Sequence, residues 1–506
     1  MNRVVLLFIL AVATPIFAEQ YFSPVQKAFI EGYAAYKDGR LEDARRFFSQ
    51  CDGNYPILQD YVTFFLKKIE DGGKVFYYYD HAAENLAEIG RLKSEPPSPE
   101  NTFNLAKTYF RARQFKEAEL IFREADDHKP FRLSSLEYLA TSLARQERYA
   151  EAIDIHRQII SEFHRNGAAV SMAMFKIGFL YLDGGDYESA KAEFARLKKI
   201  FSVYQRNQVQ WYLAWTDYKL GNFDEASKKF AVLEKEAGWR DRAAFWRAKA
   251  LDSAELLGQV AERFPGSYYG MMAQSRGENI RGKNVVPTFR SGLIARSEDR
   301  DYSIYSAAYE LDFLGTSELV VTELESIISS KKKRKDINRL EVLELARKNN
   351  GWNIVRLFEP YPRAYEKVVT GLAAKNRVES AFIWAVMREE SSFRTDVVSK
   401  SGAVGLMQLM PSTARRMMLA SFEVKDLLTP QVNVEAGVRY LSFLLKYYDS
   451  DLFLAAAAYN AGEEAVDRWI KKTPAADEFV EEIPYRETQD YVRKVMRSYW
   501  VYKGGW

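Results

Sequence analysis

Two adjacent glutamates, Glu389 and Glu390, are the residues of this sequence best placed for acid–base chemistry. Ile383, Val386 and Met387 form an apolar stripe at helical spacing, and Glu390 continues that stripe near the predicted helix end. Burial of a carboxyl in such a stripe favours the neutral acid and raises its pKa, which suits a general acid. The pattern therefore makes Glu390 a candidate catalytic acid.

Helical spacing alone does not select one of the two glutamates. Glu389 also has apolar neighbours three and four residues back, at Val386 and Ala385. A further alternative is that Glu390 is a solvated helix-end residue or pairs with Arg394. From periodicity alone these structural explanations come ahead of a catalytic role.

Other chemistries are excluded from the C-terminal part of the chain by residue type. The four histidines, at positions 81, 128, 156 and 164, and the single cysteine, Cys51, all precede residue 365. Ser-His-Asp and Cys-His nucleophiles are therefore absent there, and a zinc site is disfavoured. No phosphate-binding or dinucleotide glycine pattern occurs. Catalysis in this region would use carboxylates, Tyr, Lys or Ser.

A second group of polar and glycine-rich motifs follows the two glutamates. Residues 399–414 contain Gly402 and Gly405, which permit tight backbone approach, and Pro411 predicts the first turn of a new helix, preceded by Met410 as cap. Later motifs are Ala458-Tyr459-Asn460-Ala461-Gly462 and Ile483-Pro484-Tyr485-Arg486-Glu487-Thr488. Caps and turns explain such residues, but amide, phenol and aromatic groups in one domain also suit a sugar-binding groove.

The elements that precede these motifs are predicted to be helices from about residue 20 to 360. Several share a turn followed by Ala and, four residues on, Phe: Ala44 with Phe48, Ala118 with Phe122, Ala152, Ala190 with Phe194, and Ala226 with Phe230. The last four alanines are about 34 to 38 residues apart, close to the tetratricopeptide period. A small Ala lets two antiparallel helices approach, and the hairpins must stack to cover their apolar faces. We predict a superhelix, whose repeats are packing positions.

Breaks in the pattern predict the domain boundaries. The turn at residues 264–270 interrupts the repeat, and Pro360-Tyr361-Pro362 forces extended backbone. The predicted segments are a signal peptide at 1–18, a superhelical domain at 19–262, a helical linker region at 263–364 that completes the superhelix, and a second helical domain at 365–506.

The amino-terminal residues predict export. Asn2-Arg3 form a short basic start, residues 4–12 an apolar core too short for a membrane span, and Ala18 precedes polar Glu19. Cys51 is expected to be a buried helix residue, since one cysteine permits no internal disulfide.

The bulk composition does not indicate a charged polymer as partner. A net charge of +3 does not suggest nucleic acid. The basic run at 331–335 is expected to be solvated, with contact to an anionic polymer as the alternative.

The motifs together resemble those of the soluble lytic transglycosylases. The resemblance rests on Glu390-Ser391-x-Phe393, the segment from Ser399 through Gly405 and Gln408 to Ala414, Ala-Tyr459-Asn460-Ala-Gly, and Ile-Pro-Tyr-x-Glu487-Thr-x-x-Tyr491-Val. Gln408 follows Glu390 by eighteen residues, as in the family, whereas Thr395 stands where many members have Pro. The preceding helices resemble the family's doughnut-forming region more weakly, including Ser267-Tyr-Tyr-Gly270.

This resemblance implies an all-α chain, with a tetratricopeptide-like superhelix followed by a lysozyme-like catalytic domain. The catalytic residue is implied to be the glutamate followed by Ser, Glu390, and the residues implied to line the glycan groove are Ser399, Gly405, Gln408, Met410, Tyr459, Asn460 and Glu487. The implied substrate is the peptidoglycan glycan strand, cut between N-acetylmuramic acid and N-acetylglucosamine to leave 1,6-anhydro ends. No metal or organic cofactor is implied, and the location is the periplasm. The alternatives are a lysozyme-type hydrolase and a non-catalytic scaffold that binds peptidoglycan.

Overall fold

The structure is a computed structural model and describes residues 22–72, 81–125, 130–198, 203–276, 302–330, 337–418, 422–470 and 476–504. The described residues form helices, with two isolated antiparallel bridges and no strands, so the predicted all-α class is confirmed. The predicted signal peptide and the basic run at 331–335 lie outside the described residues. No described helix is long and apolar enough to cross a membrane.

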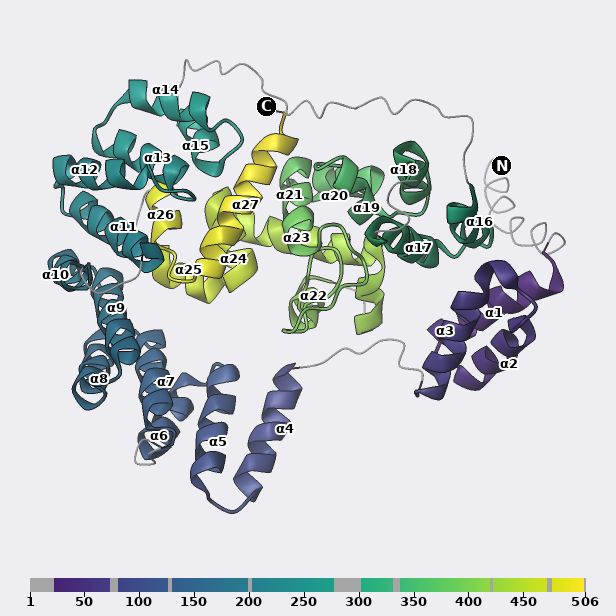
Figure 1. The fold of residues 1–506 in the computed structure, drawn as a ribbon, viewed down its shortest axis with the longest axis horizontal. Coiled ribbons are helices and arrows are strands. Elements are labelled where there is room, and N and C mark those ends of the chain that lie inside the picture. The colour runs from purple at the N-terminus through teal and green to yellow at the C-terminus, as the bar shows by residue number, and fades with distance from the viewer. Residues whose placement is uncertain are drawn as a thin grey trace, which may run out of the picture.

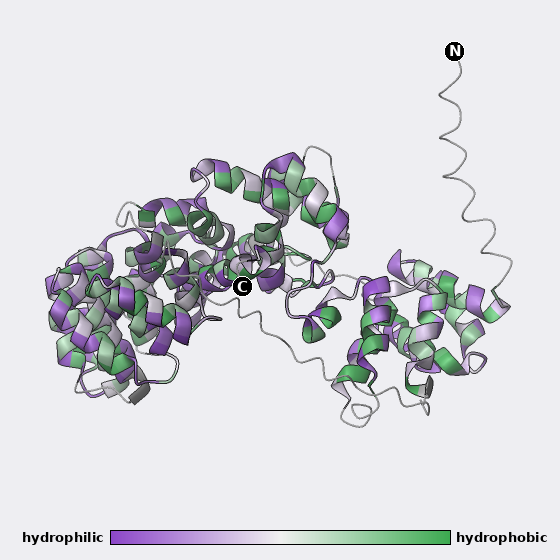
Figure 2. Ribbon diagram, turned by 90° about the horizontal axis from the view of Figure 1, so that it is seen from above, coloured by the Kyte–Doolittle hydropathy of each residue, from purple (hydrophilic) through white to green (hydrophobic). Residues whose placement is uncertain are grey.

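The first part of the chain folds into a series of antiparallel helix pairs. Its helices are α1 (Pro24–Lys37), α2 (Leu41–Cys51), η1 (Pro56–Leu58), α3 (Gln59–Glu70), α4 (His81–Ser94), α5 (Pro99–Arg111), α6 (Phe115–Ala125), α7 (Arg132–Arg145), α8 (Tyr149–Glu162), α9 (Gly167–Asp183), α10 (Tyr187–Leu197), α11 (Val203–Lys219), α12 (Phe223–Leu233), α13 (Arg240–Ala250), α14 (Ala254–Arg263) and α15 (Tyr268–Arg276). Hydrophobic and hydrophilic residues alternate along these helices, as expected for helices that pack on one side (Figure 2).

The repeated Ala and Phe positions are packing positions, as predicted. The alanines and phenylalanines of the repeat are all fully buried. Gly178 shows why the helix facing Phe194 needs a small residue, because a methyl group there would lie 2.8 Å from the Phe194 ring. Cys51 is likewise buried in α2, as expected.

The amino-terminal helices pack against a segment far along the chain. Helices η2 (Tyr302–Tyr305), α16 (Ser306–Phe313), α17 (Ser317–Ser329), α18 (Arg339–Lys348) and α19 (Trp352–Phe358) share one hydrophobic core with α1–α3. Polar contacts accompany it: the Tyr33 hydroxyl donates to Glu318 at 2.8 Å, and Gln26 donates to Glu310 at 2.7 Å. The amino-terminal helices therefore form one unit with α16–α19, and Figure 1 shows α4–α15 as an arc beside the remaining helices.

The remaining helices lie beside that arc (Figure 1). They are α20 (Glu366–Asn376), α21 (Ser380–Ser391), α22 (Pro411–Met417), η4 (Val424–Leu428), α23 (Pro430–Tyr447), α24 (Leu452–Ala461), α25 (Glu463–Ile470), α26 (Ala476–Glu482) and α27 (Arg486–Tyr502). Their core is continuous with that of α11–α15, since one cluster contains Trp211, Trp246 and Tyr269 together with Met387 and Val495.

Candidate active site

Glu390 is the penultimate residue of α21. Ile383, Val386 and Met387 on the same helix are fully buried, which confirms the apolar stripe. The helix ends at Ser391 because Ser392 adopts the left-handed conformation, with φ of 55°. Glu390 as a whole residue is only partly buried, so it lies at the edge of the core.

The serine after Glu390 fixes the helix end to the following loop. The buried Ser391 hydroxyl donates to the backbone carbonyl of Leu406 at 2.7 Å. That loop is itself folded back by antiparallel bridges that join Val404 to Val398 and to Leu409. The hydrogen bond of Ser391 therefore holds the end of α21, which carries Glu390, against the glycine-rich motif.

Gly405 is required by both conformation and space. Its φ is 76°, and a side chain there would collide with Asn433 and with the carbonyl of Leu427. Asn433 is fully buried and accepts from the Met407 N–H at 2.8 Å, while its amide donates to the carbonyls of Val404 and Leu427, both at 2.8 Å. The absence of a side chain at Gly405 thus allows the loop to pack closely against α23.

Ser399 and Gln408 also hold this loop with their side chains. The Ser399 hydroxyl accepts from the N–H groups of Ser401 at 3.2 Å and Ala403 at 3.0 Å. The Gln408 amide donates to the carbonyls of Val397 at 3.1 Å and Gly405 at 2.9 Å. The side chains of Ser399 and Gln408 therefore both stabilise the conformation of this loop.

Burial raises the pKa of Glu390 to about 8. The nearby phenol of Tyr491 favours the carboxylate and limits the rise, while the negative charges of Glu389 and Glu487 add to it. No ion pair from a cation to Glu390 occurs among the described residues, and Arg394 instead lies 3.5 Å from Asp396. Glu390 is therefore held as a neutral acid at neutral pH.

Glu389 lies in different surroundings. Its carboxylate accepts from the neighbouring Arg388 guanidinium and from the Ser498 hydroxyl at 2.7 Å. Arg388 also donates to the carbonyl of Pro360 and lies 4.5 Å from the centre of the Tyr361 ring. Glu389 is therefore a paired carboxylate that anchors α21. The structure thus distinguishes the surroundings of the two glutamates, which helical periodicity could not do.

Tyr459 and Tyr491 flank the Glu390 carboxyl. Burial, with the charge of Glu390 as the next cause, raises the pKa of both phenols well above the ordinary value, so both remain donors. The Tyr459 hydroxyl donates to the carbonyl of Met407 at 2.8 Å, and its ring lies 5.2 Å from that of Tyr440. Met410 caps α22 ahead of Pro411, as predicted, and its side chain is 38% exposed.

Asn460 and Glu487 are both exposed at the junction of α24 and α27. The side-chain amide oxygen of Asn460 accepts a hydrogen bond from the Thr488 hydroxyl at 2.7 Å. This bond links the end of α24 to the first turn of α27. Glu487 acts on Glu390 only through its charge. The structure thus places Tyr459 and Glu487 near Glu390, and Ser399, Gly405 and Gln408 in the adjoining loop.

Two residues of this region were not among the predicted site residues. Tyr491 was noted only as part of a motif, although its position four residues after Glu487 places it on the same helical face. Asn433 carries no local signal, because its partners lie in the loop about thirty residues earlier. No group of metal-binding side chains occurs among the described residues.

One family model covers the part of the chain that contains Glu390. Residues 367–481 match the transglycosylase SLT domain. In the helical array, residues 172–202 match a tetratricopeptide repeat, and residues 78–159 match the model of anaphase-promoting complex, cyclosome, subunit 3. The predicted repeat class is confirmed.

The curated relatives and solved structures that this chain resembles are also described as lytic transglycosylases. The soluble lytic murein transglycosylase of Escherichia coli is 26% identical over 294 residues, which are 53% of this chain and 44% of that protein. The chain therefore spans less than half the length of this relative. The structure of the 70 kDa soluble lytic transglycosylase from Escherichia coli aligns over 95% of this chain and 96% of that one, with a TM-score of 0.53 and 17% identity. An inactive mutant of the lytic transglycosylase Slt from Pseudomonas aeruginosa aligns over 96% and 83%, with a TM-score of 0.52 and 19% identity. These structures share the fold across the array and the SLT domain.

Proposed function

We propose, from the transglycosylase SLT domain that residues 367–481 form, that this chain is a periplasmic lytic transglycosylase in which Glu390 is the acid and then the base. The observation that carries the proposal is the Glu390 carboxyl, whose pKa burial raises to about 8. A carboxyl that is protonated near neutral pH can donate to the leaving glycosidic oxygen.

The proposed reaction uses one carboxyl. Glycosidases of the common type place two carboxylates across the scissile bond. Here Glu389 is bound by Arg388 and Ser498, so it is not free to act as the second group. In the proposed reaction the substrate's N-acetyl oxygen stabilises the anomeric centre after protonated Glu390 has donated. The Glu390 carboxylate then removes the proton of the muramoyl C6 hydroxyl, which closes onto C1.

The attacking hydroxyl belongs to the substrate, so its effective concentration is high and no water is needed. Tyr459 and Tyr491 are proposed to form hydrogen bonds beside the reacting carboxyl. The Tyr491 phenol stays protonated and can donate, whereas the Tyr459 hydroxyl donates its proton to the Met407 carbonyl and can accept. Gln408, Met410, Asn460 and Glu487 are proposed to contact the sugars along the strand, with Ser399 and Gly405 shaping the loop.

The test is a product analysis of intact sacculi digested by the wild-type chain, Glu390→Gln and Glu389→Gln. Wild type should release 1,6-anhydromuramoyl ends, which are lighter by one water than hydrolysed ends. Glu390→Gln should lose at least about a thousandfold in rate, because proton donation and abstraction are both removed. Glu389→Gln is the matched control, because it makes the same change next in sequence, and it should keep the anhydro product. Reducing muramoyl ends from the wild type would replace the proposal by a hydrolase.

A further inference from the structure

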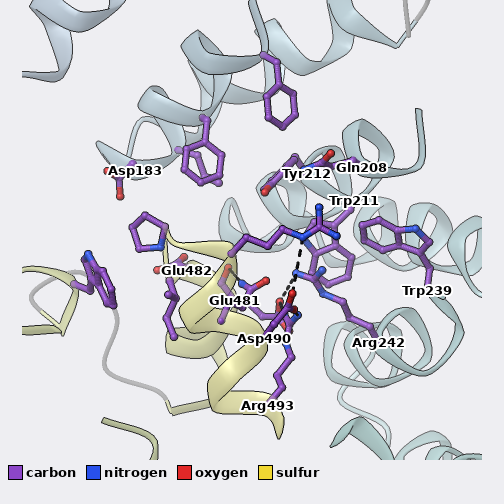
Figure 3. Close-up of a pocket in the computed structure, with 18 of the residues that line it drawn as sticks. Asp183, Gln208, Trp211, Tyr212, Trp239, Arg242, Glu481, Glu482, Asp490 and Arg493 are labelled. Atoms are coloured by element: carbon purple, nitrogen blue, oxygen red, sulfur yellow. Dashed lines mark hydrogen bonds and ion pairs between the residues drawn. The ribbon is translucent and has the colours of Figure 1, made fainter. Parts of the chain in front are cut away.

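A cavity lies between the helical array and the SLT domain, and its lining does not include Glu390. Its volume is about 830 Å³. Figure 3 shows Gln208, Trp211, Tyr212 and Trp239 on one wall and Glu481, Glu482, Asp490 and Arg493 on the facing wall. A cavity of this size is typical of small-molecule sites, which run from about 300 to 1,000 Å³.

Helix α27 separates this cavity from the candidate active site. Its cavity-lining residues are Arg486, Gln489, Asp490 and Arg493, which recur at three- and four-residue spacing and so share one face. Glu487 and Tyr491, which act on Glu390, lie on a different face of the same helix. The two sites are therefore distinct.

The wall from the helical array is aromatic. Phe175 and Phe179 each meet the Tyr212 ring edge-on, with ring centres 5.7 Å apart. Trp211 and Trp239 lie 5.8 Å apart, and the Arg242 guanidinium covers Trp211 at 3.5 Å. Trp211 is only 2% exposed and Tyr212 is stacked on Phe194, so the half-buried Trp239 is the indole ring among these that a ligand can contact.

The charged groups at the facing wall are paired, in part with Arg242 of α13 on the array wall. Glu481 is buried and accepts from Arg242 and, at 2.7 Å, from Arg493. Asp490 lies 3.5 Å from Arg493 and 3.9 Å from Arg486. Such pairs present many donors and acceptors with little net charge, which suits a neutral polar ligand better than a phosphate or a charged peptide.

Some donors at the cavity lack an acceptor. The Tyr268 hydroxyl lines the cavity on a residue only 7% exposed, yet it has no hydrogen-bond partner among the described residues. The Nε atoms of Arg242 and Arg493 are also buried without a partner there. Buried donors of this kind cost stability unless an acceptor reaches them.

We propose that this cavity binds a neutral saccharide, a short stretch of N-acetylated glycan, at a site separate from the one that cuts it. Stacking rings and paired planar polar groups fit a sugar, which has apolar faces and a rim of hydroxyl and amide groups. The identification of the saccharide as cell-wall glycan rests on the proposed function. The site would hold a strand or product against the helical array while Glu390 acts elsewhere.

The test is fluorine NMR of the full chain labelled with 5-fluorotryptophan and carrying Glu390→Gln to prevent turnover. The probes are N,N′-diacetylchitobiose, which is neutral and N-acetylated, the peptide-free N-acetylglucosaminyl-N-acetylmuramic acid disaccharide, which adds one lactyl carboxylate, and the free stem tetrapeptide. The resonances of Trp211 and Trp239, assigned from Trp211→Phe and Trp239→Phe, should shift saturably with either saccharide. The resonance of Trp352, which lies outside the cavity, serves as an internal control and should not move.

Two variants test the wall itself. Trp239→Ala should weaken disaccharide binding at this site by about tenfold, because one stacking face is lost. Phe223→Ala removes an aromatic ring that is 47% exposed on α12 outside the cavity and should leave binding unchanged. Unmoved Trp211 and Trp239 resonances in the folded protein, or shifts with the tetrapeptide and not the sugars, would overturn the proposal.

The outcomes separate this proposal from the proposed function. Anhydro products from sacculi without a shift at Trp239 would reject the cavity alone. A shift at Trp239 in a chain that cuts no glycan would leave the saccharide site standing and reject the catalytic proposal.

Discussion

Two neighbouring glutamates show how strongly a residue's surroundings decide its chemistry. Glu389 meets a guanidinium and a hydroxyl, which stabilise its carboxylate, whereas burial of Glu390 without a cation favours the neutral acid. The predicted apolar stripe places Glu390 correctly, but the sequence could not show that Arg388 pairs with Glu389. That pairing depends on Pro360 and Ser498, which are far apart in sequence.

The pH dependence of cleavage follows from the raised pKa of Glu390. The acid form is needed for proton donation, so the rate should be flat below a pH of about 8 and fall about tenfold per unit above it. Replacing Tyr491 with Phe removes the nearby phenol hydroxyl, which favours the carboxylate of Glu390. The pKa should rise further, and the falling limb of a kcat/KM profile should move to higher pH.

Tyr499→Phe makes the same change on the same helix, where the hydroxyl contacts Glu379 and Lys503. Its profile should match that of the wild type. A Tyr491→Phe profile that is unmoved or shifted to lower pH would contradict the assigned role of Tyr491.

At the scale of elements, the loop between α21 and α22 depends on one buried amide. Asn433 makes three hydrogen bonds to the backbone of the loop and of η4, each of 2.8 Å. Asn433→Ala would leave the Leu427 carbonyl and the Met407 N–H buried without their partner, while the Val404 carbonyl would keep only the Leu409 N–H. The free energy of unfolding should fall by about 2–4 kcal/mol, measured by urea denaturation.

Asn54→Ala is the control, because the exposed Asn54 amide makes one long bond of 3.3 Å. It should change the unfolding free energy by less than about 0.5 kcal/mol. Equal effects of the two substitutions would mean that Asn433 does not hold the loop.

Local sequence patterns were sufficient for the helices but not for this loop. The Ala and Phe repeat, and Pro411 after Met410, act through neighbours within a few residues, so their structures could be predicted. The left-handed Gly405 has a purpose only once Asn433 is packed against it. The glycine-rich motif therefore indicated that its backbone lies close to another group, but it did not identify that group as Asn433.

At the scale of the whole molecule, the acidic helix α26 joins the SLT domain to the helical array. Lys219 lies 2.9 Å from Glu478 and 3.0 Å from Glu482, and Arg276 lies 2.9 Å from Asp477. Burial alone would raise the pKa of Glu481. The guanidinium groups of Arg242 and Arg493 at this carboxylate hold its pKa below the ordinary value.

Glu481→Ala should therefore destabilise the join between the two parts of the molecule. It leaves Arg242 and Arg493 without their shared carboxylate, at a cost of about 3–5 kcal/mol. Calorimetry should show a lower Tm. Glu225→Ala, which removes an exposed carboxylate paired with Lys228, is the control and should leave the Tm nearly unchanged. An unaltered Tm in Glu481→Ala would show that the hydrophobic core alone joins the two parts.

These long-range contacts could not be predicted from the sequence. Nothing in α26 identifies Lys219 or Arg276 as partners, and nothing in α1–α3 identifies the segment with Glu310 and Glu318. Periodicity describes one element at a time, whereas these pairs depend on how the superhelix curves. The sequence therefore predicted the class of the fold but not the contacts that hold its parts together.

The most direct test of the account is the titration of the Glu390 carboxyl itself. Carbon-13 NMR of the full chain with labelled glutamate side chains, compared with Glu390→Gln, would identify its resonance and follow it with pH. The account predicts a midpoint near 8, which leaves the acid protonated at neutral pH. A midpoint near 4.5, the ordinary value for glutamate, would contradict the account, because Glu390 would then be a carboxylate with no proton to donate.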